Sequence, residues 1–261
     1  MAKPLAAITG ASAGLGAVFA RKLAARGYDL MLIARREDRL RQVADEAARE
    51  SGAASQVLAA DLSVHDEVSW VADRLAGESR LALLVNNAGF GVHGPLLNEP
   101  LEEHERMHRV HIDALFRLTH AALGGMLARR AGAIINVSSV AAFFRSTGSV
   151  TYGASKSWIN AFTEGLYLEL RQGKSPVKVQ ALCPGFTYTE FHDVAHVDRG
   201  TIPKYLWLSA ESVVDASLKG LDKGKLFVVP DWKYKAIVAA MGVMPASLRV
   251  PIELWSPHRK E

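Results

Sequence analysis

The sequence predicts a doubly wound α/β fold, built around one parallel seven-stranded sheet with helices on both faces. Three observations predict it. Short apolar runs alternate with longer amphipathic segments, and most runs are apolar on successive residues, which is typical of strands buried on both faces. No repeat, low-complexity tract or linker interrupts this alternation before residue 186. We therefore expect residues 1–261 to form a single domain.

The seven expected strands are the short apolar runs. They cover residues 5–9, 28–34, 55–60, 81–87, 133–139, 177–183 and 226–230. Six segments with helical periodicity lie between them, at residues 14–26, 37–51, 65–78, 101–130, 152–172 and 210–222. Because crossovers between parallel strands are right-handed, this order winds the chain into an open sheet. Ligands of such sheets bind beyond the carboxyl ends of the strands.

Composition argues against several classes of protein. The net charge is only +4, with basic residues interspersed among acidic ones, so a nucleic-acid partner is a poor expectation. The single cysteine, Cys183, has no intrachain disulfide partner, and the start of the chain leaves no room for the apolar core of a signal peptide. The longest apolar run, residues 236–244, is far shorter than the roughly 20 residues that span a bilayer. We expect a soluble, cytoplasmic protein without a membrane span.

A glycine-rich turn, TGASAGLG at residues 9–16, follows the first expected strand and opens the first expected helix. Glycine permits a sharp turn and a close approach to a pyrophosphate, whose charge the helix N–H groups and dipole stabilise. Glycine-rich loops are common, so the strand before and the helix after give this motif its meaning. The residues expected to bind the phosphates are Gly10, Ser12, Ala13, Gly14, Leu15 and Gly16.

Two arginines at the end of the second expected strand predict the type of dinucleotide. An acidic residue in this region usually holds the ribose of NAD, whereas arginine accommodates the 2′-phosphate of NADP. Here Arg35 and Arg36 precede any acidic residue. The alternative is a solvated basic helix start, which the positive end of the helix dipole disfavours. The pair therefore predicts NADP(H), with Arg35 as the main contact and Arg36 as the second.

A tyrosine and a lysine begin the helix after the fifth expected strand, which ends in Ser138 and Ser139. Tyr152 and Lys156 are four residues apart and therefore lie on one helix face. An ammonium beside a phenol lowers the phenol's pKa from about 10, which suits proton transfer near neutral pH. Such a pair also arises by chance, so its place after a strand that ends in serine gives it weight.

Together these motifs resemble the NADP-preferring branch of the short-chain dehydrogenase/reductase family. The resemblance rests on TGASAGLG (9–16), NNAG (86–89), a serine 13 residues before YGASK (152–156), and PGFTYT (184–189), in this order. It covers residues 4–230 and implies a Rossmann fold. It also implies that Tyr152 is the general acid/base, that Lys156 lowers its pKa and holds the nicotinamide ribose, and that Ser139 polarises the substrate carbonyl. The 13-residue spacing selects Ser139 over Ser138, because neighbours on a strand face opposite ways.

The resemblance implies further cofactor contacts. The family's pair of an aspartate and a hydrophobic residue near the adenine falls on Asp61 and Leu62. The NNAG residues would shape the cofactor pocket, and the residues after the sixth strand would lie along the nicotinamide. These residues are Asn87, Ala88, Gly89, Pro184, Gly185, Thr187 and Thr189.

His111 is the one clear departure from the family pattern. It stands where the family usually has an asparagine that distorts its helix and helps hold water in a proton relay toward the lysine. One interpretation is a hydrogen-bonded core histidine, since imidazole can replace an amide's donor and acceptor. Another is a working relay member, since a pKa near 6.5 suits proton transfer. A metal site with His104 and His108 is the weakest, because no cysteine or carboxylate completes it, so we expect no metal.

Aromatic residues dominate the segments after strands four, five and six, where the substrate pocket is expected. They suggest an apolar or aromatic ketone or aldehyde, or the matching secondary alcohol, and residues 186–208 are expected to form a lid over it. The expected pocket residues are Phe90, His93, Phe143, Phe144, Tyr188, Phe191, Tyr205 and Trp207.

The sequence thus predicts an oxidoreductase that transfers a hydride between NADP(H) and a carbonyl or secondary alcohol. The alternative, motivated by His111, is an NADP-binding sensor or scaffold with weak turnover. The family resemblance implies a homodimer or homotetramer packed through residues 101–130 and 152–172. We expect Cys183 to be a small buried residue rather than a nucleophile. In the C-terminal extension, residues 231–261, we expect the apolar part to cover the cleft or a subunit rather than a membrane surface.

Overall fold

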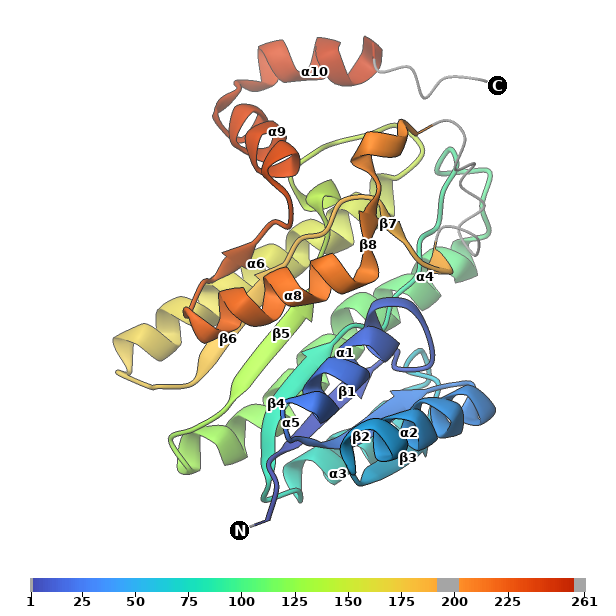
Figure 1. Ribbon diagram of the computed structural model, residues 1–261. Helices are drawn as coiled ribbons and strands as arrows, with labels where there is room; N and C mark the ends of the chain where they lie inside the picture. The colour runs from blue at the N-terminus through green and yellow to red at the C-terminus, as the bar shows by residue number, and fades with distance from the viewer. Residues whose placement is uncertain (1, 192–201, 256–261) are drawn as a thin grey trace.

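The computed structural model describes residues 2–191 and 202–255. The strands of the central sheet are β1 (Leu5–Thr9), β2 (Asp29–Ala34), β3 (Ser55–Ala59), β4 (Leu81–Asn86), β5 (Ala133–Val137), β6 (Lys178–Leu182) and β9 (Phe227–Val228). The described residues form a seven-stranded sheet in the order β3-β2-β1-β4-β5-β6-β9, with parallel neighbours throughout (Figure 1). The predicted doubly wound fold is confirmed, and each strand ends within two residues of its predicted bounds.

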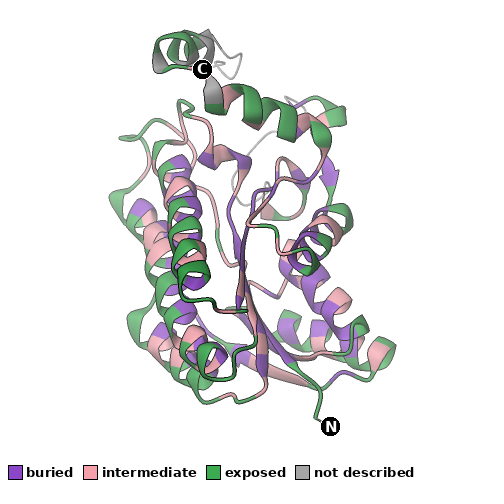
Figure 2. Cartoon of the chain, turned by 90° about the vertical axis from the view of Figure 1, so that its left-hand side faces the viewer, coloured by how far each residue is buried: buried purple, intermediate pink, exposed green. Residues whose placement is uncertain are grey.

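Helices cover both faces of this sheet. One face carries α1 (Gly14–Ala25), α2 (Glu37–Ser51) and α8 (Ala210–Asp222), and the other carries α3 (His65–Ala76), α5 (Leu115–Ala128) and α6 (Val150–Gln172). The first strand shows how both faces are filled. Ala6 and Ile8 join the apolar cluster under α1, whereas Leu5 and Ala7 join the one under α3 and α5. Burial is accordingly concentrated on the sheet and the inner helix faces (Figure 2).

The predicted helix at 101–130 is confirmed over residues 101–128, with a π-helical turn inside it. The chain forms α4 (Leu101–His108), a six-residue π-helix at Arg109–Ala114, and then α5. A π-helical turn holds an extra residue and redirects the side chains that follow it, and such turns are frequent at functional sites. His111 lies within this π-helix and is only 1% exposed.

The structure also contains a small second sheet and two C-terminal helices that are not among the predicted strands and helices. β7 (Thr187–Tyr188) pairs in parallel with β8 (Leu208–Ser209), which brings together the two ends of the expected lid. The C-terminal extension forms α9 (Trp232–Val243) and α10 (Ala246–Trp255), which stand beyond the carboxyl end of the sheet (Figure 1). Residues 192–201 of the lid and 256–261 of the extension lie outside the described residues.

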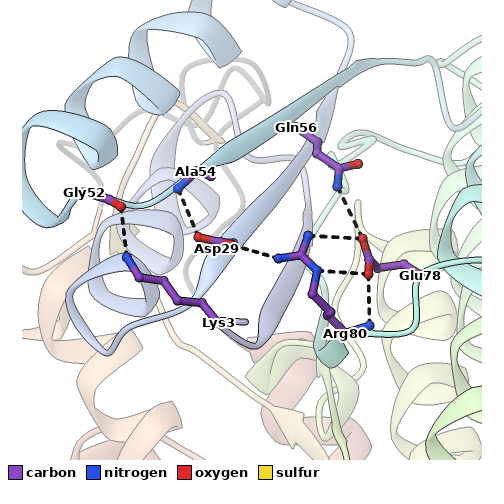
Figure 3. Close-up of polar contacts among 7 residues, drawn as sticks. All are labelled: Lys3, Asp29, Gly52, Ala54, Gln56, Glu78 and Arg80. Atoms are coloured by element: carbon purple, nitrogen blue, oxygen red, sulfur yellow. Dashed lines mark hydrogen bonds and ion pairs between the residues drawn. The ribbon is translucent and has the colours of Figure 1, made fainter. Parts of the chain in front are cut away.

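Polar contacts join the opposite, amino-terminal edge of the sheet (Figure 3). Arg80, just before β4, donates to Asp29 at the start of β2 at 2.9 Å and pairs with Glu78 at 3.4 Å. Gln56 in β3 donates to the same glutamate at 3.3 Å. Burial alone would raise the pKa of Glu78, but hydrogen bonds and the Arg80 charge hold it below its ordinary value. These contacts link three strand starts, far from the carboxyl edge.

No helix in the described residues is both long enough and apolar enough to cross a membrane.

Candidate active site

The glycine-rich turn after β1 is closed tightly on itself at the carboxyl edge of the sheet. Gly10 has φ 66°, a backbone conformation that residues with a side chain rarely adopt. A Cβ on Gly16 would overlap the Gly10 carbonyl oxygen. The next helix, α1, begins after Ala13, whose methyl side chain cannot cap it. The first N–H groups of α1 therefore face this turn without a capping side chain, as an anion site requires.

The NNAG segment after β4 braces the same turn. Asn87 Nδ2 donates to the Thr9 carbonyl oxygen at 2.9 Å and to the Gly10 carbonyl oxygen at 3.3 Å. The backbone N–H groups of Asn87 and Ala88 both donate to Thr9 Oγ1 at 2.9 Å. The threonine that precedes the turn is thus a supporting residue that the sequence motif contains but did not single out.

The two arginines after β2 lie at the surface beside this turn. Arg35 Nη1 is 3.9 Å from Asp61 Oδ2, and the arginine side chain is 62% exposed. Arg36 Nη2 donates to Ser12 Oγ at 3.3 Å and to Glu190 Oε2 at 3.0 Å. Arg36 thus lies against the glycine-rich turn, and Arg35 lies against the loop after β3. The turn, the start of α1 and these arginines fit the phosphates of a dinucleotide such as NAD(P).

Asp61 and Leu62 follow β3, where the resemblance places the adenine. Leu62 is buried at 6% exposure. Burial alone would raise the pKa of Asp61, but hydrogen bonds from Ser63 and the charge of Arg35 hold it below its ordinary value. The carboxylate is therefore ionised and accepts 2.9 Å and 2.7 Å hydrogen bonds from Ser63 N and Oγ.

Ser139, Tyr152 and Lys156 come together at the carboxyl ends of β5 and β6. The Ser139 side chain lies near the Tyr152 hydroxyl, since it opposes the effect of burial on the tyrosine pKa, and its Oγ accepts a 3.1 Å hydrogen bond from Ala141 N. Lys156 Nζ lies 5.7 Å from the centroid of the Tyr152 ring and donates to the Val137 carbonyl oxygen at 3.0 Å. Ser138 Oγ instead donates to the backbone carbonyl of Lys156 at 3.0 Å, so it points into the packing between β5 and α6. The two neighbouring serines therefore face opposite ways.

Burial sets the protonation of this site. It raises the pKa of Tyr152 to about 12 and lowers the pKa of Lys156 to about 7. The expected lowering of the tyrosine pKa is not found in this structure, because desolvation of the phenolate raises it and the Ser139 side chain opposes that rise only in part. At neutral pH the phenol keeps its proton, so it is a hydrogen-bond and proton donor.

His111 is hydrogen-bonded through both ring nitrogens. The Phe90 N–H donates to Nε2 at 3.3 Å, so the ring proton is on Nδ1, which lies 2.9 Å from Ser155 Oγ. Ser155 Oγ in turn donates to the Tyr152 carbonyl oxygen at 2.8 Å. Burial, with the nearby Lys156 charge, lowers the pKa of His111 well below 6.5. The imidazole is therefore neutral and fully committed, which favours the hydrogen-bonded core interpretation over the relay.

The glycine before Phe90 makes room for this ring, since a Cβ on Gly89 would lie 2.5 Å from His111 Nε2. The other histidines of the stripe do not join it in a metal site. His104 Nδ1 instead pairs with Thr151 Oγ1 at 2.7 Å. Residues 2–191 and 202–255 contain no group of three or more histidine, cysteine, aspartate or glutamate side chains placed to hold a metal.

Three of the expected pocket residues lie around the tyrosine or beside its neighbours. The ring centroids of His93 and Phe191 are 5.7 Å and 6.0 Å from that of Tyr152, and Phe90 is 6.3 Å from His111. Val92 and Met107 complete a small apolar cluster with the Tyr152 ring. Farther along, Tyr188 stacks on Trp207 with 4.7 Å between ring centroids.

The other expected pocket residues lie elsewhere. Phe143 packs edge-on against Phe227 of β9, with ring centroids 6.4 Å apart, and Phe144 packs against the main apolar cluster. Both follow the short 3-10 helix Val140–Ala142. Tyr205 is 65% exposed. The expectation that these three aromatic residues line the substrate pocket stays a prediction.

Tyr234 in α9 is a site residue that the sequence reasoning missed. It is 4% exposed, and its hydroxyl accepts a hydrogen bond from Phe186 N at 3.0 Å and donates to the Leu206 carbonyl oxygen at 2.8 Å. Its ring occupies the space where Gly185 would carry a Cβ. The spacing of Tyr234, Val238 and Met241 along one helix face was the available signal for an inward-facing side chain.

Cys183 is fully buried at the end of β6. Its thiol donates to Asn160 Oδ1 at 3.5 Å, and burial raises its pKa to about 12. Such a thiol stays protonated at neutral pH and is a poor nucleophile, which agrees with the expected packing role.

Comparison with known proteins is consistent with this site. Residues 4–199 match the short chain dehydrogenase family. A short chain dehydrogenase of Pseudocercospora fijiensis is 37% identical over 188 residues, a match that covers 71% of this chain but only 60% of that relative.

Two solved structures match nearly the whole chain. The short-chain dehydrogenase from Sphingobium yanoikuyae in complex with NADPH has a TM-score of 0.84 and 34% identity, covering 94% of this chain and 97% of that one. The bulky-bulky ketone specific alcohol dehydrogenase from Comamonas testosteroni has a TM-score of 0.79 and 29% identity, covering 94% and 96%. With the fold, the glycine-rich turn and the tyrosine, lysine and serine in place, the chain belongs to the short-chain dehydrogenase family.

Proposed function

We propose that the protein is an NADP(H)-dependent oxidoreductase that transfers a hydride between the cofactor and an apolar or aromatic carbonyl compound, or the matching secondary alcohol. The observation that carries this proposal is the meeting of the Ser139 and Tyr152 hydroxyl groups beside Lys156. The NADPH complex of the Sphingobium relative and the bulky-ketone specificity of the Comamonas relative support it.

The residues act on the oxygen of the substrate. The bound cofactor supplies the hydride, and negative charge then grows on the carbonyl oxygen, where aimed hydrogen-bond donors stabilise it. Ser139 and Tyr152 supply two such donors. Tyr152, with its pKa of about 12, stays protonated until the oxygen takes its proton. In its protonated form, the nearby Lys156 amine then stabilises the phenolate that remains.

The cofactor preference rests on the two arginines after β2. Arg35 is exposed and only loosely paired with Asp61, so its guanidinium is available to a 2′-phosphate. Arg36 donates to Ser12 and would be the second contact. We expect Arg35→Ala to weaken NADPH binding far more than NADH binding, measured by titration of cofactor fluorescence. Equal losses for the two cofactors would refute the phosphate contact.

The reaction itself is tested by following NADPH and NADH oxidation with a panel of aliphatic and aromatic ketones and aldehydes, and the reverse reaction with secondary alcohols. Tyr152→Phe is expected to lower the turnover of the best substrate by about 100-fold or more, since it removes the proton donor. Ser139→Ala should also lower turnover strongly, while Ser138→Ala, a matched change on the adjacent residue, should have a much smaller effect because Ser138 faces the packing with α6.

One outcome would favour the sensor or scaffold instead. If NADPH binds tightly, no panel member is reduced or oxidised, and Tyr152→Phe changes nothing measurable, the enzyme proposal fails. No contact of His111 in the described residues favours that alternative, because its ring nitrogens are both used in holding the site together.

We also propose that two or four copies associate through the outer faces of α5 and α6. Phe116 and Leu168 are 49% and 61% exposed there, and the rings of Trp158 and Phe162 stack with centroids 5.0 Å apart. Exposed apolar side chains gathered on one face are typical of an association surface. Light scattering should give a dimer or tetramer mass, and Phe116→Glu combined with Leu168→Glu should lower it. A monomer mass for the unaltered protein would contradict this proposal.

A further inference from the structure

The C-terminal extension reaches back to the site through one side chain. Tyr234 lies beyond the residues that match the family, which end at 199. Its hydroxyl bridges Phe186 and Leu206, the two ends of the segment that follows β6. Directly beside this bridge, Leu208 N donates to the Phe186 carbonyl oxygen at 2.8 Å, and β7 pairs with β8. One tyrosine thus ties together the two ends of a loop of about 20 residues.

Both parts of the Tyr234 side chain are used. Its ring fills the space over Gly185, where any Cβ would overlap three ring carbons. Its hydroxyl makes one accepted and one donated hydrogen bond, both to backbone groups, and burial raises its pKa. Phenylalanine would keep the ring contact but lose both hydrogen bonds. Ring and hydroxyl can therefore be tested separately.

The start of α9 holds this tyrosine in place. Asp231, with φ 69°, caps the helix by accepting a 2.8 Å hydrogen bond from Lys233 N. Lys233 Nζ donates to the Tyr205 carbonyl oxygen at 2.9 Å, one residue from the Leu206 carbonyl that Tyr234 uses. The same helical turn therefore makes two contacts to the end of the bridged segment.

The segment that Tyr234 holds continues directly to the cofactor turn and to the tyrosine of the site. Thr189 packs on Gly14, where a Cβ would be 3.2 Å from the threonine Cβ. Phe191 lies with its ring centroid 6.0 Å from that of Tyr152. A shift of Gly185 or Phe186 would move both contacts, because only a few residues separate them.

We propose that Tyr234 is a positioning residue: it fixes the backbone at Gly185, Phe186 and Leu206 and thereby sets the substrate wall formed by Tyr188, Phe191 and Trp207. Through it the C-terminal extension determines which carbonyl compounds fit. This inference rests on the proposed function for its effect on substrate choice. Its effect on the backbone does not depend on that function, so the two can fail separately.

The first test compares Tyr234→Phe with Tyr167→Phe, a matched change on α6 that keeps Arg171 stacked over its ring and lies away from the site. Hydrogen exchange followed by mass spectrometry should show faster exchange over residues 185–188 and 206–209 in Tyr234→Phe only. Removing two neutral hydrogen bonds should also raise KM for a bulky diaryl ketone by about three- to tenfold. KM for a small methyl ketone should change less than twofold, and the changes in kcat and in the Kd of NADPH should stay smaller than the change in KM for the bulky ketone.

Unchanged exchange in Tyr234→Phe would overturn the proposal, whatever the activity. Faster exchange with unchanged selectivity between the two ketones would overturn the specificity role. If exchange rises but even the unaltered protein reduces no ketone, the proposed function fails while the backbone role stands.

A second pair of variants tests the ring. Gly185→Ala should lower activity by crowding the Tyr234 ring. In a Tyr234→Ala background, where the ring is absent, the same change should lower activity less. Losses that simply add in the double variant would overturn the ring contact, and Gly185→Ala alone tests that contact with Tyr234 unaltered.

Discussion

Two glycine-phenylalanine pairs at the carboxyl edge of the sheet are held in the same way by different parts of the chain. After β4, the His111 ring lies against Gly89 and accepts a hydrogen bond from Phe90 N. After β6, the Tyr234 ring lies against Gly185, and the Tyr234 hydroxyl accepts a hydrogen bond from Phe186 N. In each pair the glycine leaves room for the ring, and the N–H of the following phenylalanine holds that side chain by a hydrogen bond.

We call His111 and Tyr234 the two braces. They differ in the elements that hold them. His111 belongs to the π-helix, is 1% exposed and is bonded on its far side to Ser155 of α6. Tyr234 belongs to a terminal helix whose outer face is exposed, as Trp232 at 71% shows. His111 is buried and contacts several elements, so we expect it to be held rigidly. Tyr234 lies on a terminal helix with an exposed outer face, so we expect that helix to be displaced more easily. The first should therefore govern stability, and the second should govern the shape of the substrate wall.

The largest expected effect comes from crowding the rigid brace. Gly89→Ala places a Cβ 2.5 Å from His111 Nε2, and the ring is buried and hydrogen-bonded through both nitrogens. We expect a loss of about 2–3 kcal/mol of unfolding free energy, within the usual range for overpacking. Gly185→Ala should cost less, because α9 can shift outward. Urea unfolding of both variants measures this, and an equal or larger loss for Gly185→Ala would break the comparison.

Replacing the histidine itself should have the next largest effect. His111→Phe leaves the buried Phe90 N–H without its acceptor and Ser155 without its donor, at a cost of about 1–3 kcal/mol. His111→Asn keeps a donor and an acceptor and should lose less stability, with activity similar or improved. Thermal unfolding and steady-state kinetics distinguish the two. A large loss of kcat in His111→Asn, together with loss of a titration near neutrality in the pH profile, would restore the relay interpretation.

The pH dependence of stability separates the braces further. The folded-state pKa of His111 lies well below 6.5, so below that pH the unfolded chain binds a proton that the folded chain does not. Stability should therefore fall as pH decreases from 6.5, by up to about 1.4 kcal/mol per pH unit from this group. His111→Asn should flatten that slope, and Tyr234→Phe should leave it unchanged. Urea unfolding between pH 5 and pH 7 tests this, and parallel slopes in all three proteins would contradict it.

The smallest effect is expected at Lys233. Its ammonium donates to the Tyr205 carbonyl oxygen at 2.9 Å, but its side chain is 32% exposed. Lys233→Ala should cost less than about 1 kcal/mol, as is usual for exposed charged contacts. It should leave exchange at Phe186 close to that of the unaltered protein. A loss as large as that of Tyr234→Phe would mean that the lysine holds the segment.

Sequence reasoning did best where chemistry dictates residue type and spacing together. The apolar runs predicted all strands of the sheet to within two residues, since a short run that is apolar on successive residues is typical of a strand buried on both faces. The order of a glycine-rich turn, a serine and a Tyr152–Lys156 pair brought three distant segments to one edge. The 13-residue spacing before Tyr152 chose Ser139 over Ser138.

It did worst where the outcome depends on depth and direction. The tyrosine pKa turned on desolvation, which spacing along a helix does not report. The π-helix holds His111, whose hydrogen-bond partners come from the loop after β4 and from α6, and helical periodicity does not report such partners. Tyr234 was missed because its partners are backbone groups, which carry no signature in the sequence.

The last strand of the sheet ends at Val228, before the helix that carries Tyr234 begins. The sheet and the reacting groups therefore come from one stretch of chain, and in the role proposed for Tyr234 part of the substrate wall is set by another. Under that proposal, substitutions after Val228 change the substrate wall without removing a strand of the seven-stranded sheet or the proton donor.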